Sequence, residues 1–439
     1  MGGNVIDPGT AAWMLFGGFF GMLALRVPVA IALGLACLPP LLIEDRLWPM
    51  ILVQETFNAY NSFILLAVPF FLLAANLMTI GGITDRLIRL SRAMVGHLPG
   101  SLAQINVVLS IFFAGISGSS TADAASQGKM FIEAQRKEGY DVSFSVAITA
   151  VSAVLAAIIP PSIMMIVWGG VLTVSIGGLF LAGVIPGLLL GLVQMATVHA
   201  YAKARGYPTY GRASWGEFGS ALFVSVPALM TPFIIIGGKI FGWFTATEAA
   251  CIAVLYAMIL SVIVYREMNL QGLWKAFSET GRFAAITLFC VGTASAFGWL
   301  LAFYKIPDAL LSGVSAWEMG PILTGFFIAG VFLVVGCFLD AIPAIIIVGT
   351  ILQPVAEAAG MHPIHFAMVG IVSLAFGLVT PPYGLCLLIS CAVAGVRVMD
   401  VLKDTCLMLL PMLGVLALLI LWPDVALFLP RLLEPDFLK

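Results

Sequence analysis

The chain has 439 residues, of which 61% are hydrophobic and only 10% are charged, and this composition excludes an ordinary soluble domain. Its net charge of −2 and its 20 scattered basic residues give no indication of nucleic-acid binding. Several stretches without Asp, Glu, Lys or Arg exceed the roughly 20 residues that cross a bilayer as a helix. The longest runs from Val142 to Ala202. The sequence therefore predicts an all-α polytopic membrane protein.

In chain order, the hydropathy pattern predicts about ten transmembrane helices, at 12–26, 28–44, 62–80, 143–175, 177–202, 218–238, 246–265, 283–304, 364–396 and 404–422. Two further regions, 98–133 and 321–354, have a helix–break–helix pattern that returns to its starting side. The segment 82–96 is amphipathic and carries three arginines. We expect it to lie along the inner membrane interface.

The basic residues orient these helices, because Lys and Arg are enriched in inner loops. With the N-terminus outside, the inner side holds all 20 basic residues except Arg46, Lys239, Lys305, Arg431 and Lys439. This bias predicts that both termini face outward.

The second half of the chain repeats landmarks of the first half at a spacing of 221 residues. The stretch "VSAVLAAIIPP" (151–161) aligns with "VSLAFGLVTPP" (372–382), and Gly115 aligns with Gly336. The first spans of the two halves run in opposite directions in the predicted topology. The halves are therefore predicted to form an inverted repeat.

Each Pro-Pro pair breaks a predicted span, because proline lacks a backbone donor. Matching breaks in inverted halves indicate the binding site of a secondary transporter, although ordinary proline kinks are the plainer alternative. The stretches "GISGSST" (115–121) and "GCFLDAIP" (336–343) are predicted to be the tips of two re-entrant hairpins. Each tip is expected to approach the broken helix of its own half.

The residues around these breaks supply oxygen atoms that could bind ions. Carbonyls at half-helix C-termini favour cations, amides at half-helix N-termini favour anions, and Ser162 and Thr380 add hydroxyl groups. Asp340 lies between two long uncharged stretches, where a carboxylate is usually functional. Its surroundings favour Na+, with a proton-carrying carboxyl as the alternative. Asp123 is expected in the returning arm of the first hairpin, where capping a helix is an alternative to ion binding.

The sequence contains no motif that indicates an enzyme. It has no P-loop pattern for ATP hydrolysis, and "GISGS" does not match the nucleophile elbow of hydrolases. His362 and His365 are too few ligands for a transition-metal site. We therefore expect neither catalysis nor a transition metal.

Six separated motifs resemble the large membrane subunit of tripartite ATP-independent periplasmic (TRAP) transporters. In chain order they are "LLAVPFFLLAANLM" (65–78), "FFAGISGSSTADAA" (112–125), "IIPPS" (158–162), "GGKIFGWFTATEAACIAVLYA" (237–257), "GCFLDAIPAIIIVGTILQP" (336–354) and "GLVTPPYGLCLLIS" (377–390). The resemblance covers nearly the whole chain. Ala246 departs from it, because the family usually has proline there.

This resemblance implies an elevator-type fold of the ion-transporter superfamily, with sodium-driven symport and no use of ATP. Two or more coupling Na+ ions are implied. The ion sites carried over by position are Ser117, Gly118, Ser119 and Ile159 in one half, and Asp340, Val379, Thr380 and Gly384 in the other. The implied substrate site between the hairpin tips comprises Ser120, Thr121, Pro161, Ser162 and Pro382.

The resemblance also implies partners and a location. The partners are a small four-helix membrane subunit and a periplasmic substrate-binding protein, with membrane lipid around the chain. The substrate is an organic acid such as a C4-dicarboxylate or sialic acid, and the location is the bacterial inner membrane. A proton-coupled carboxylate transporter or antiporter of the same fold is the alternative function.

The predicted organisation has five parts. They are N-terminal scaffold helices (1–61), repeat 1 (62–175), central scaffold helices (176–282), inverted repeat 2 (283–396), and a C-terminal helix with its tail (397–439).

Overall fold

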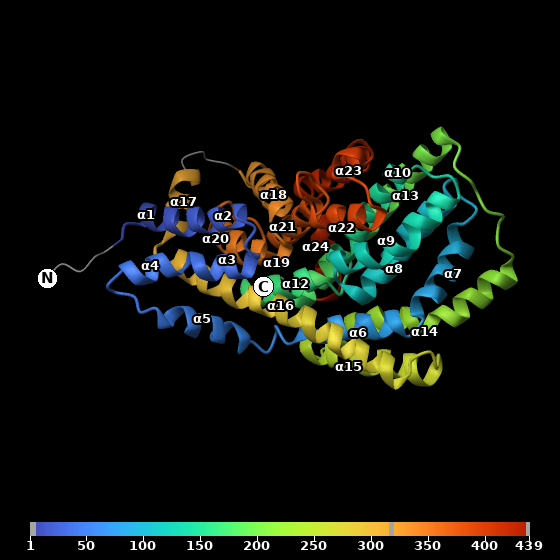
Figure 1. The fold of residues 1–439 in the computed structure, drawn as a ribbon, viewed down its shortest axis with the longest axis horizontal. Coiled ribbons are helices and arrows are strands. Elements are labelled where there is room, and N and C mark those ends of the chain that lie inside the picture. The colour runs from blue at the N-terminus through green and yellow to red at the C-terminus, as the bar shows by residue number, and fades with distance from the viewer. Residues whose placement is uncertain (1–5, 316–319, 436–439) are drawn as a thin grey trace.

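The computed structural model describes residues 6–315 and 320–435, and every regular element within these ranges is a helix (Figure 1). The predicted all-α class is confirmed. Among the described helices, seven are long and apolar enough to cross a membrane, or nine if each of two bent helix pairs counts as one span. Lys439, which was predicted on the outer side, lies outside the described residues.

The N-terminal part forms two short helical rods followed by a third helix. The first rod joins α1 (Pro8–Ala12), the π-helical η1 (Trp13–Gly17) and α2 (Gly18–Ala24), and the second joins α3 (Val29–Ala36) and α4 (Leu38–Ile43). The third helix, α5 (Met50–Tyr60), was not predicted. Just beyond α4, the buried Glu44 accepts a hydrogen bond of 2.9 Å from the Ile6 amide and pairs with Arg46. The Ile6–Glu44 hydrogen bond therefore joins the N-terminal segment to the end of the second rod.

Repeat 1 contains seven helices. They are α6 (Ala67–Ile80), α7 (Ile83–Val95), α8 (Ser101–Ser117), α9 (Ser120–Lys137), α10 (Val142–Ala153), α11 (Leu155–Ile158) and α12 (Ile163–Val171). α7 is the predicted amphipathic segment, and it turns by 72° from α6 at Gly82, whose φ of +73° favours glycine. The α8–α9 pair is the predicted first hairpin. The Pro-Pro pair separates α11 from α12, with a bend of 42°.

Three long helical units connect the repeats. They are α13 (Ile176–Arg205), α14 (Trp215–Ile240), and α15 (Ala246–Met258) with its π-helical continuation η2 (Ile259–Val264). α14 and α15 both begin with a capping box, formed by Ser214 with Glu217 and by Thr245 with Glu248. Ala246 thus starts a well-capped helix without the proline that the family resemblance led us to expect.

Repeat 2 and the C-terminal part contain the remaining helices. In chain order they are α16 (Leu270–Phe303), α17 (Ile306–Ser315), α18 (Pro321–Phe338), α19 (Ala341–Ala344), η3 (Ile345–Gly349), α20 (Thr350–Ala358), α21 (Pro363–Gly377), α22 (Leu385–Ala394), α23 (Val398–Leu421) and α24 (Asp424–Leu433). The second predicted hairpin is therefore α18 followed by the continuous run of α19, η3 and α20. The second broken span is α21 and α22.

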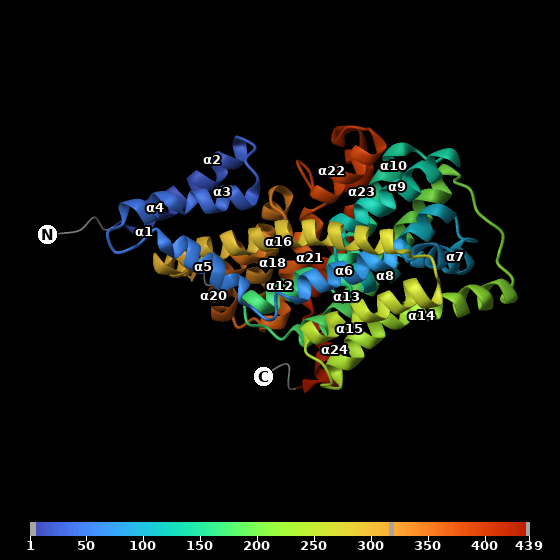
Figure 2. The same cartoon turned by 60° about the horizontal axis from the view of Figure 1, so that its bottom comes forward.

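The leading helices of the two repeats, α6 and α16, lie side by side and run in opposite directions (Figures 1 and 2). Two hydrogen bonds give the register. Asn76 of α6 donates to Thr280 at 2.9 Å, whereas Thr56 of α5, earlier in the chain, donates to the carbonyl of Gly292, later in α16. Residue numbers therefore increase along α5 and α6 in the direction in which they decrease along α16, so the two segments are antiparallel.

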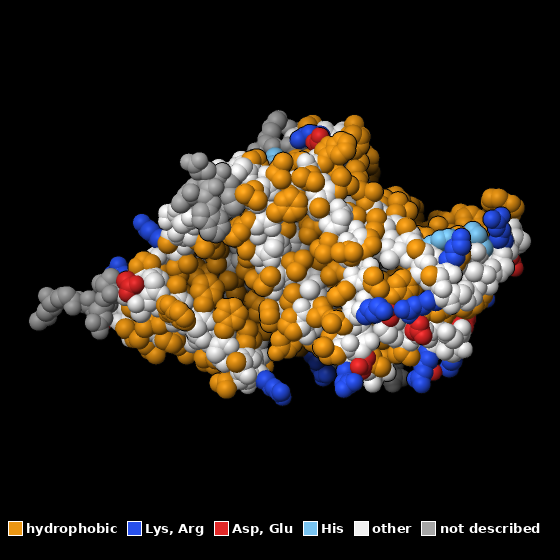
Figure 3. Space-filling model, turned by 90° about the horizontal axis from the view of Figure 1, so that it is seen from above, with side chains coloured by type: hydrophobic (Ala, Val, Ile, Leu, Met, Phe, Trp, Pro, Cys, Tyr) orange, Lys and Arg blue, Asp and Glu red, His pale blue; other side chains and the backbone are white. Residues whose placement is uncertain are grey.

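α8 of the first hairpin and the broken-span helices α10, α11, α12 and α21 form the buried centre, whereas α18 of the second hairpin and the outer helices expose apolar side chains. Trp168 of α12 and Phe376 of α21 are fully buried, whereas Trp13, Phe223 and Leu270 are about four-fifths exposed. Apolar side chains cover much of the face in Figure 3. An apolar exterior of this extent is expected where helices face lipid rather than water.

Candidate functional site

The first hairpin turns at Gly118. α8 ends at Ser117, Gly118 adopts a left-handed conformation (φ +60°), and α9 begins two residues later. The Gly118 carbonyl accepts a hydrogen bond of 3.2 Å from the Ile163 amide at the start of α12. A Cβ at position 118 would lie 2.6 Å from the carbonyl oxygen of Pro161. The turn therefore holds the first hairpin against the break in its own half, as predicted.

The second hairpin makes the corresponding contact. α18 ends at Phe338, and Asp340 caps α19 by accepting a hydrogen bond of 2.8 Å from the Ala341 amide. The Gly384 amide, at the second break, donates to the Cys337 carbonyl at 3.2 Å. Each hairpin tip is thus tied by one backbone hydrogen bond to the broken helix of its own repeat.

The aligned glycines Gly115 and Gly336 permit close backbone approach. A Cβ at Gly377 would lie 2.6 Å from the Cα of Gly336, so α18 and α21 nearly touch at this point. In the first half, a Cβ at Gly115 would lie 3.2 Å from the ring of Pro232 and 3.8 Å from the Pro160 carbonyl. Glycine at both positions lets a hairpin pack against its neighbours.

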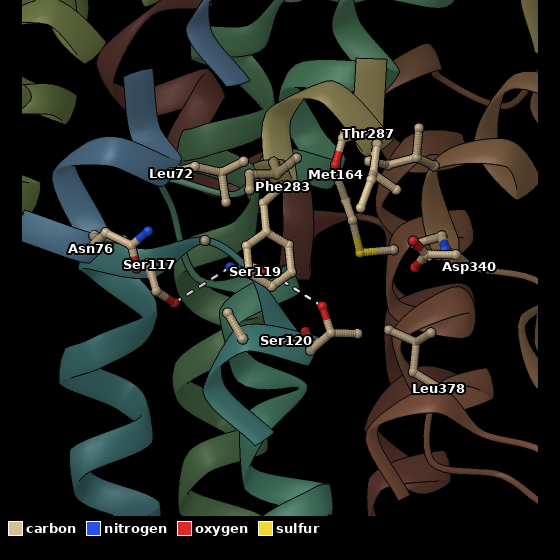
Figure 4. A pocket seen from close by; sticks show the side chains of 18 residues that line it. Leu72, Asn76, Ser117, Ser119, Ser120, Met164, Phe283, Thr287, Asp340 and Leu378 are labelled. Carbon is tan, nitrogen blue, oxygen red and sulfur yellow. Dashed lines mark hydrogen bonds between the residues drawn. The ribbon is translucent and has the colours of Figure 1, made fainter. Parts of the chain in front are cut away.

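The two hairpin tips border one cavity of about 270 Å³. Residues 117–122 contribute from the first hairpin and residues 340–342 from the second. Figure 4 shows the serines of the first tip on one side and Asp340 on the other, with Met164 and Phe283 between them. Among the described residues, Asp340 is the only ionisable one in the lining, and its side chain is exposed to the cavity.

The predicted site residues fall into two groups. Those that line the cavity are Ser117, Gly118, Ser119, Ser120, Thr121 and Asp340. Those that lie at the breaks, outside the cavity wall, are Ile159, Pro161, Ser162, Val379, Thr380, Pro382 and Gly384. In the second group, the hydroxyl of Ser162 donates to the Ala157 carbonyl at 2.6 Å and that of Thr380 to the Phe376 carbonyl at 2.7 Å. Both hydroxyls keep an oxygen lone pair for a further contact.

The outer helices supply a wall that the sequence analysis did not predict. α6 contributes Leu72 and Asn76, and α16 contributes Phe283 and Thr287. Asn76 was the available signal, because it is an isolated amide in an apolar span. Its side-chain nitrogen donates to Thr280, so it joins the two outer helices beside the cavity.

Asp123 is fully buried in the first turn of α9. The residue at the N-cap position is Ser119, so Asp123 does not cap this helix. Neither of its carboxylate oxygens has a hydrogen-bond partner among the described residues. The capping alternative is therefore not supported.

The described residues contain no group of three or more His, Cys, Asp or Glu side chains arranged to hold a metal ion. The oxygen donors at the hairpin tips and breaks are carbonyls, hydroxyls and carboxylates, which suit hard cations better than transition metals.

Two hairpins facing two broken helices, inside a multi-pass helical bundle, define a membrane transporter with a central site. Residues 16–425 match the family model described as "Tripartite ATP-independent periplasmic transporter, DctM component". The chain therefore belongs to this family, and the resemblance found in its motifs is confirmed. It is a transport permease component of an ATP-independent system, and not an enzyme.

Two curated relatives and one solved structure extend this comparison. The chain is 35% identical to the sialic acid TRAP transporter large permease protein SiaM of Vibrio cholerae, over 94% of this chain and 97% of the relative. It is 34% identical to the C4-dicarboxylate TRAP transporter large permease protein DctM of Pseudomonas aeruginosa, over 87% and 89%. The structure of the Alcanivorax borkumensis YdaH transporter superposes with a TM-score of 0.60 at 14% identity, covering 85% of this chain and 87% of that one, and supports the fold alone.

Proposed function

We propose that this chain imports an organic acid by sodium-driven symport, with the acid bound in the cavity between the hairpin tips. The observation that carries the proposal is the convergence of both tips, each tied to its own broken helix, on one cavity. This arrangement brings two sets of oxygen donors, one from each repeat, to the same place. The proposal is in keeping with the family to which the chain belongs.

The coupling ions would bind at the edge of the cavity, where each tip meets its break. In repeat 1 the donors are at Ser117, Gly118 and Ser119, with the carbonyls that end α11 near Ile159. In repeat 2 they are Asp340 with the carbonyls and hydroxyl at 379–380 and the turn at Gly384. A cation at either place would receive backbone carbonyl oxygens at helix ends, each of which has two lone pairs.

An organic anion would be held without a basic side chain, since none lines the cavity in the described part of the chain. Residues 120–122, the first turn of α9, lie in the cavity lining, where the N–H groups of this turn and the hydroxyl of Thr121 would be available to an anion. Helix N-termini bind carboxylates through such amides. A bound Na+ nearby would hold the residues of the hairpin tip in place for the acid, and this dependence would couple the acid to the ion.

Transport would follow an elevator mechanism, in which the hairpins and broken helices move as one body past α6 and α16. The predicted domain boundary assigned α13 to the static helices. Its packing favours the moving body instead, because α13 contacts α8, α11, α12, α21 and α23. The moving body would thus comprise α8–α13 and α18–α23.

A small membrane subunit and a periplasmic binding protein would complete the system, and the chain would lie in the bacterial inner membrane with both termini on the periplasmic side. The binding protein would contribute most of the selectivity. The substrates named for SiaM and DctM, sialic acid and C4-dicarboxylates, are the first compounds to screen.

The test is uptake into proteoliposomes that contain the chain with its small subunit, supplied with the binding protein and a radiolabelled acid. An inward Na+ gradient should drive uptake, and a pH gradient at equal Na+ should not. Asp340→Asn should abolish sodium-stimulated uptake with the protein still folded. Uptake driven by the pH gradient alone would favour the proton-coupled alternative.

A further inference from the structure

Asp123 is a buried acidic residue that has no role in the transport site proposed above. Its side chain is 0% exposed, and both of its oxygens lack a hydrogen-bond partner among the described residues. None of the ion pairs found in the described parts of the chain includes it. A bare carboxylate in such a place is strongly disfavoured unless a cation or a proton neutralises it.

Further buried oxygens without partners lie on α9 and on the helix packed against it. The side chain of Ser117 lies close to the carboxylate, without a hydrogen bond of ordinary geometry. The buried hydroxyl of Ser120, one turn before Asp123 in α9, also has no partner in the described structure. α22 packs against α9, and its Ser390 hydroxyl is likewise buried without a partner.

Asp123 and Asp340 share one neighbour in the second broken span. The buried thiol of Cys386, at the start of α22, is within electrostatic range of both Asp123 and Asp340. Each hairpin thus carries one carboxylate in the first turn after its tip, Asp123 in α9 and Asp340 at the N-cap of α19.

We propose that Asp123 supplies the negative charge of the first cation site. It would balance a Na+ ion held by Ser117, Gly118 and Ser119, as Asp340 balances the ion of the second site. This inference rests on the proposed sodium-driven function. It assigns one carboxylate to each Na+ ion, so that each occupied ion site would be electrically neutral as it crosses the membrane. Pairing each ion with a carboxylate lowers the free-energy cost of moving it through the low-dielectric membrane interior.

The test is equilibrium binding of ²²Na+ to the purified permease with its small subunit, together with the sodium dependence of its melting temperature. Wild type should bind two Na+ ions per chain. Asp123→Asn keeps the size of the side chain and removes its charge, and it should leave one ion bound, with the Na+ concentration for half-saturation of the first site raised at least about tenfold. The double variant with Asp340→Asn should bind none.

Glu133→Gln is the matched control, because Glu133 is an exposed carboxylate on the same helix, and its sodium binding should equal that of wild type. Asp123→Ser repeats the measurement with a smaller neutral side chain if Asp123→Asn does not fold. Two Na+ ions bound with wild-type affinity in either Asp123 variant would overturn the inference. Absence of sodium binding in wild type would instead reject the proposed function on which it rests.

Discussion

At the scale of single residues, the first hairpin tip depends on a position where only glycine fits. Gly118 has a positive φ, and its missing Cβ leaves room for the Pro161 carbonyl. The "GISGSST" motif identified this turn from the sequence, because small and hydroxyl residues interrupt an apolar stretch there. The tight approach to the break depends on long-range packing, which no local pattern encodes.

Gly118→Ala should therefore separate the hairpin tip from the first break. The left-handed conformation alone costs a non-glycine residue about 1–2 kcal/mol, and the 2.6 Å contact adds a displacement of the tip. We expect loss of the sodium-dependent rise in melting temperature. The control is Gly139→Ala, since Gly139 has a φ of +86° and nothing within 4 Å of the added Cβ. Equal effects of both substitutions would mean that backbone strain, rather than the contact, is responsible.

At the scale of helices, the sequence predicted the breaks and the hairpins more securely than the walls around them. The Pro-Pro pairs and the isolated Asp340 are local signals that need no knowledge of packing. The contribution of α6 and α16 to the cavity depends on which faces of two long apolar helices meet the hairpins. Their sequences are apolar on several faces, so periodicity does not select one. The same ambiguity explains why the predicted boundary separated α13 from the hairpins against which it packs.

A second prediction concerns the connection between the N-terminal segment and the α3–α4 rod. The hydrogen bond from the Arg46 guanidinium holds the pKa of the Glu44 carboxyl at about 2, below its ordinary 4.5, although burial acts in the opposite direction. Because the folded pKa is the lower one, this group stabilises the fold above about pH 4.5. That stabilisation should decline as the pH falls from 4.5 towards 2.

The measurement is the melting temperature of wild type and Glu44→Gln between pH 6 and pH 3. The difference between the two proteins should be largest at pH 6 and should shrink as the pH is lowered. Glu279→Gln, which removes a half-exposed carboxylate from an i,i+4 pair, should show a much smaller difference at every pH. A difference for Glu44→Gln that stays constant down to pH 3 would contradict the assigned pKa.

At the scale of the whole molecule, the proposed mechanism divides the chain into a moving and a static body, and α16 lies at their boundary. On one side α16 packs against α3 and α5, and on the other it contacts α19 and η3 of the second hairpin. The cavity lies at this boundary too, since both bodies line it.

Crosslinks placed on the two sides of α16 should therefore have opposite effects. A Cβ at Gly298 would lie 3.9 Å from Ile346 in η3, and a Cβ at Gly34 would lie 3.3 Å from Thr293. In a background without the seven native cysteines, crosslinking Gly298→Cys to Ile346→Cys should arrest uptake. The Gly34→Cys and Thr293→Cys pair joins two static helices and should leave uptake near its uncrosslinked rate. Continued uptake in fully crosslinked Gly298→Cys/Ile346→Cys protein would rule out this division.

The charge content of the cavity lining also bears on how such permeases diversify. Asp340 is the only ionisable residue there in the described structure, so under the proposed function no arginine or lysine would have to be gained or relocated when the cargo changes from one acid to another. Backbone amides keep the same geometry whatever side chains surround them. Substitutions among apolar wall residues such as Leu72, Phe283 and Ile286 would then suffice to reshape the space. The permease could then follow a change in the selectivity of its binding protein by small steps that leave the residues of the proposed ion sites unchanged.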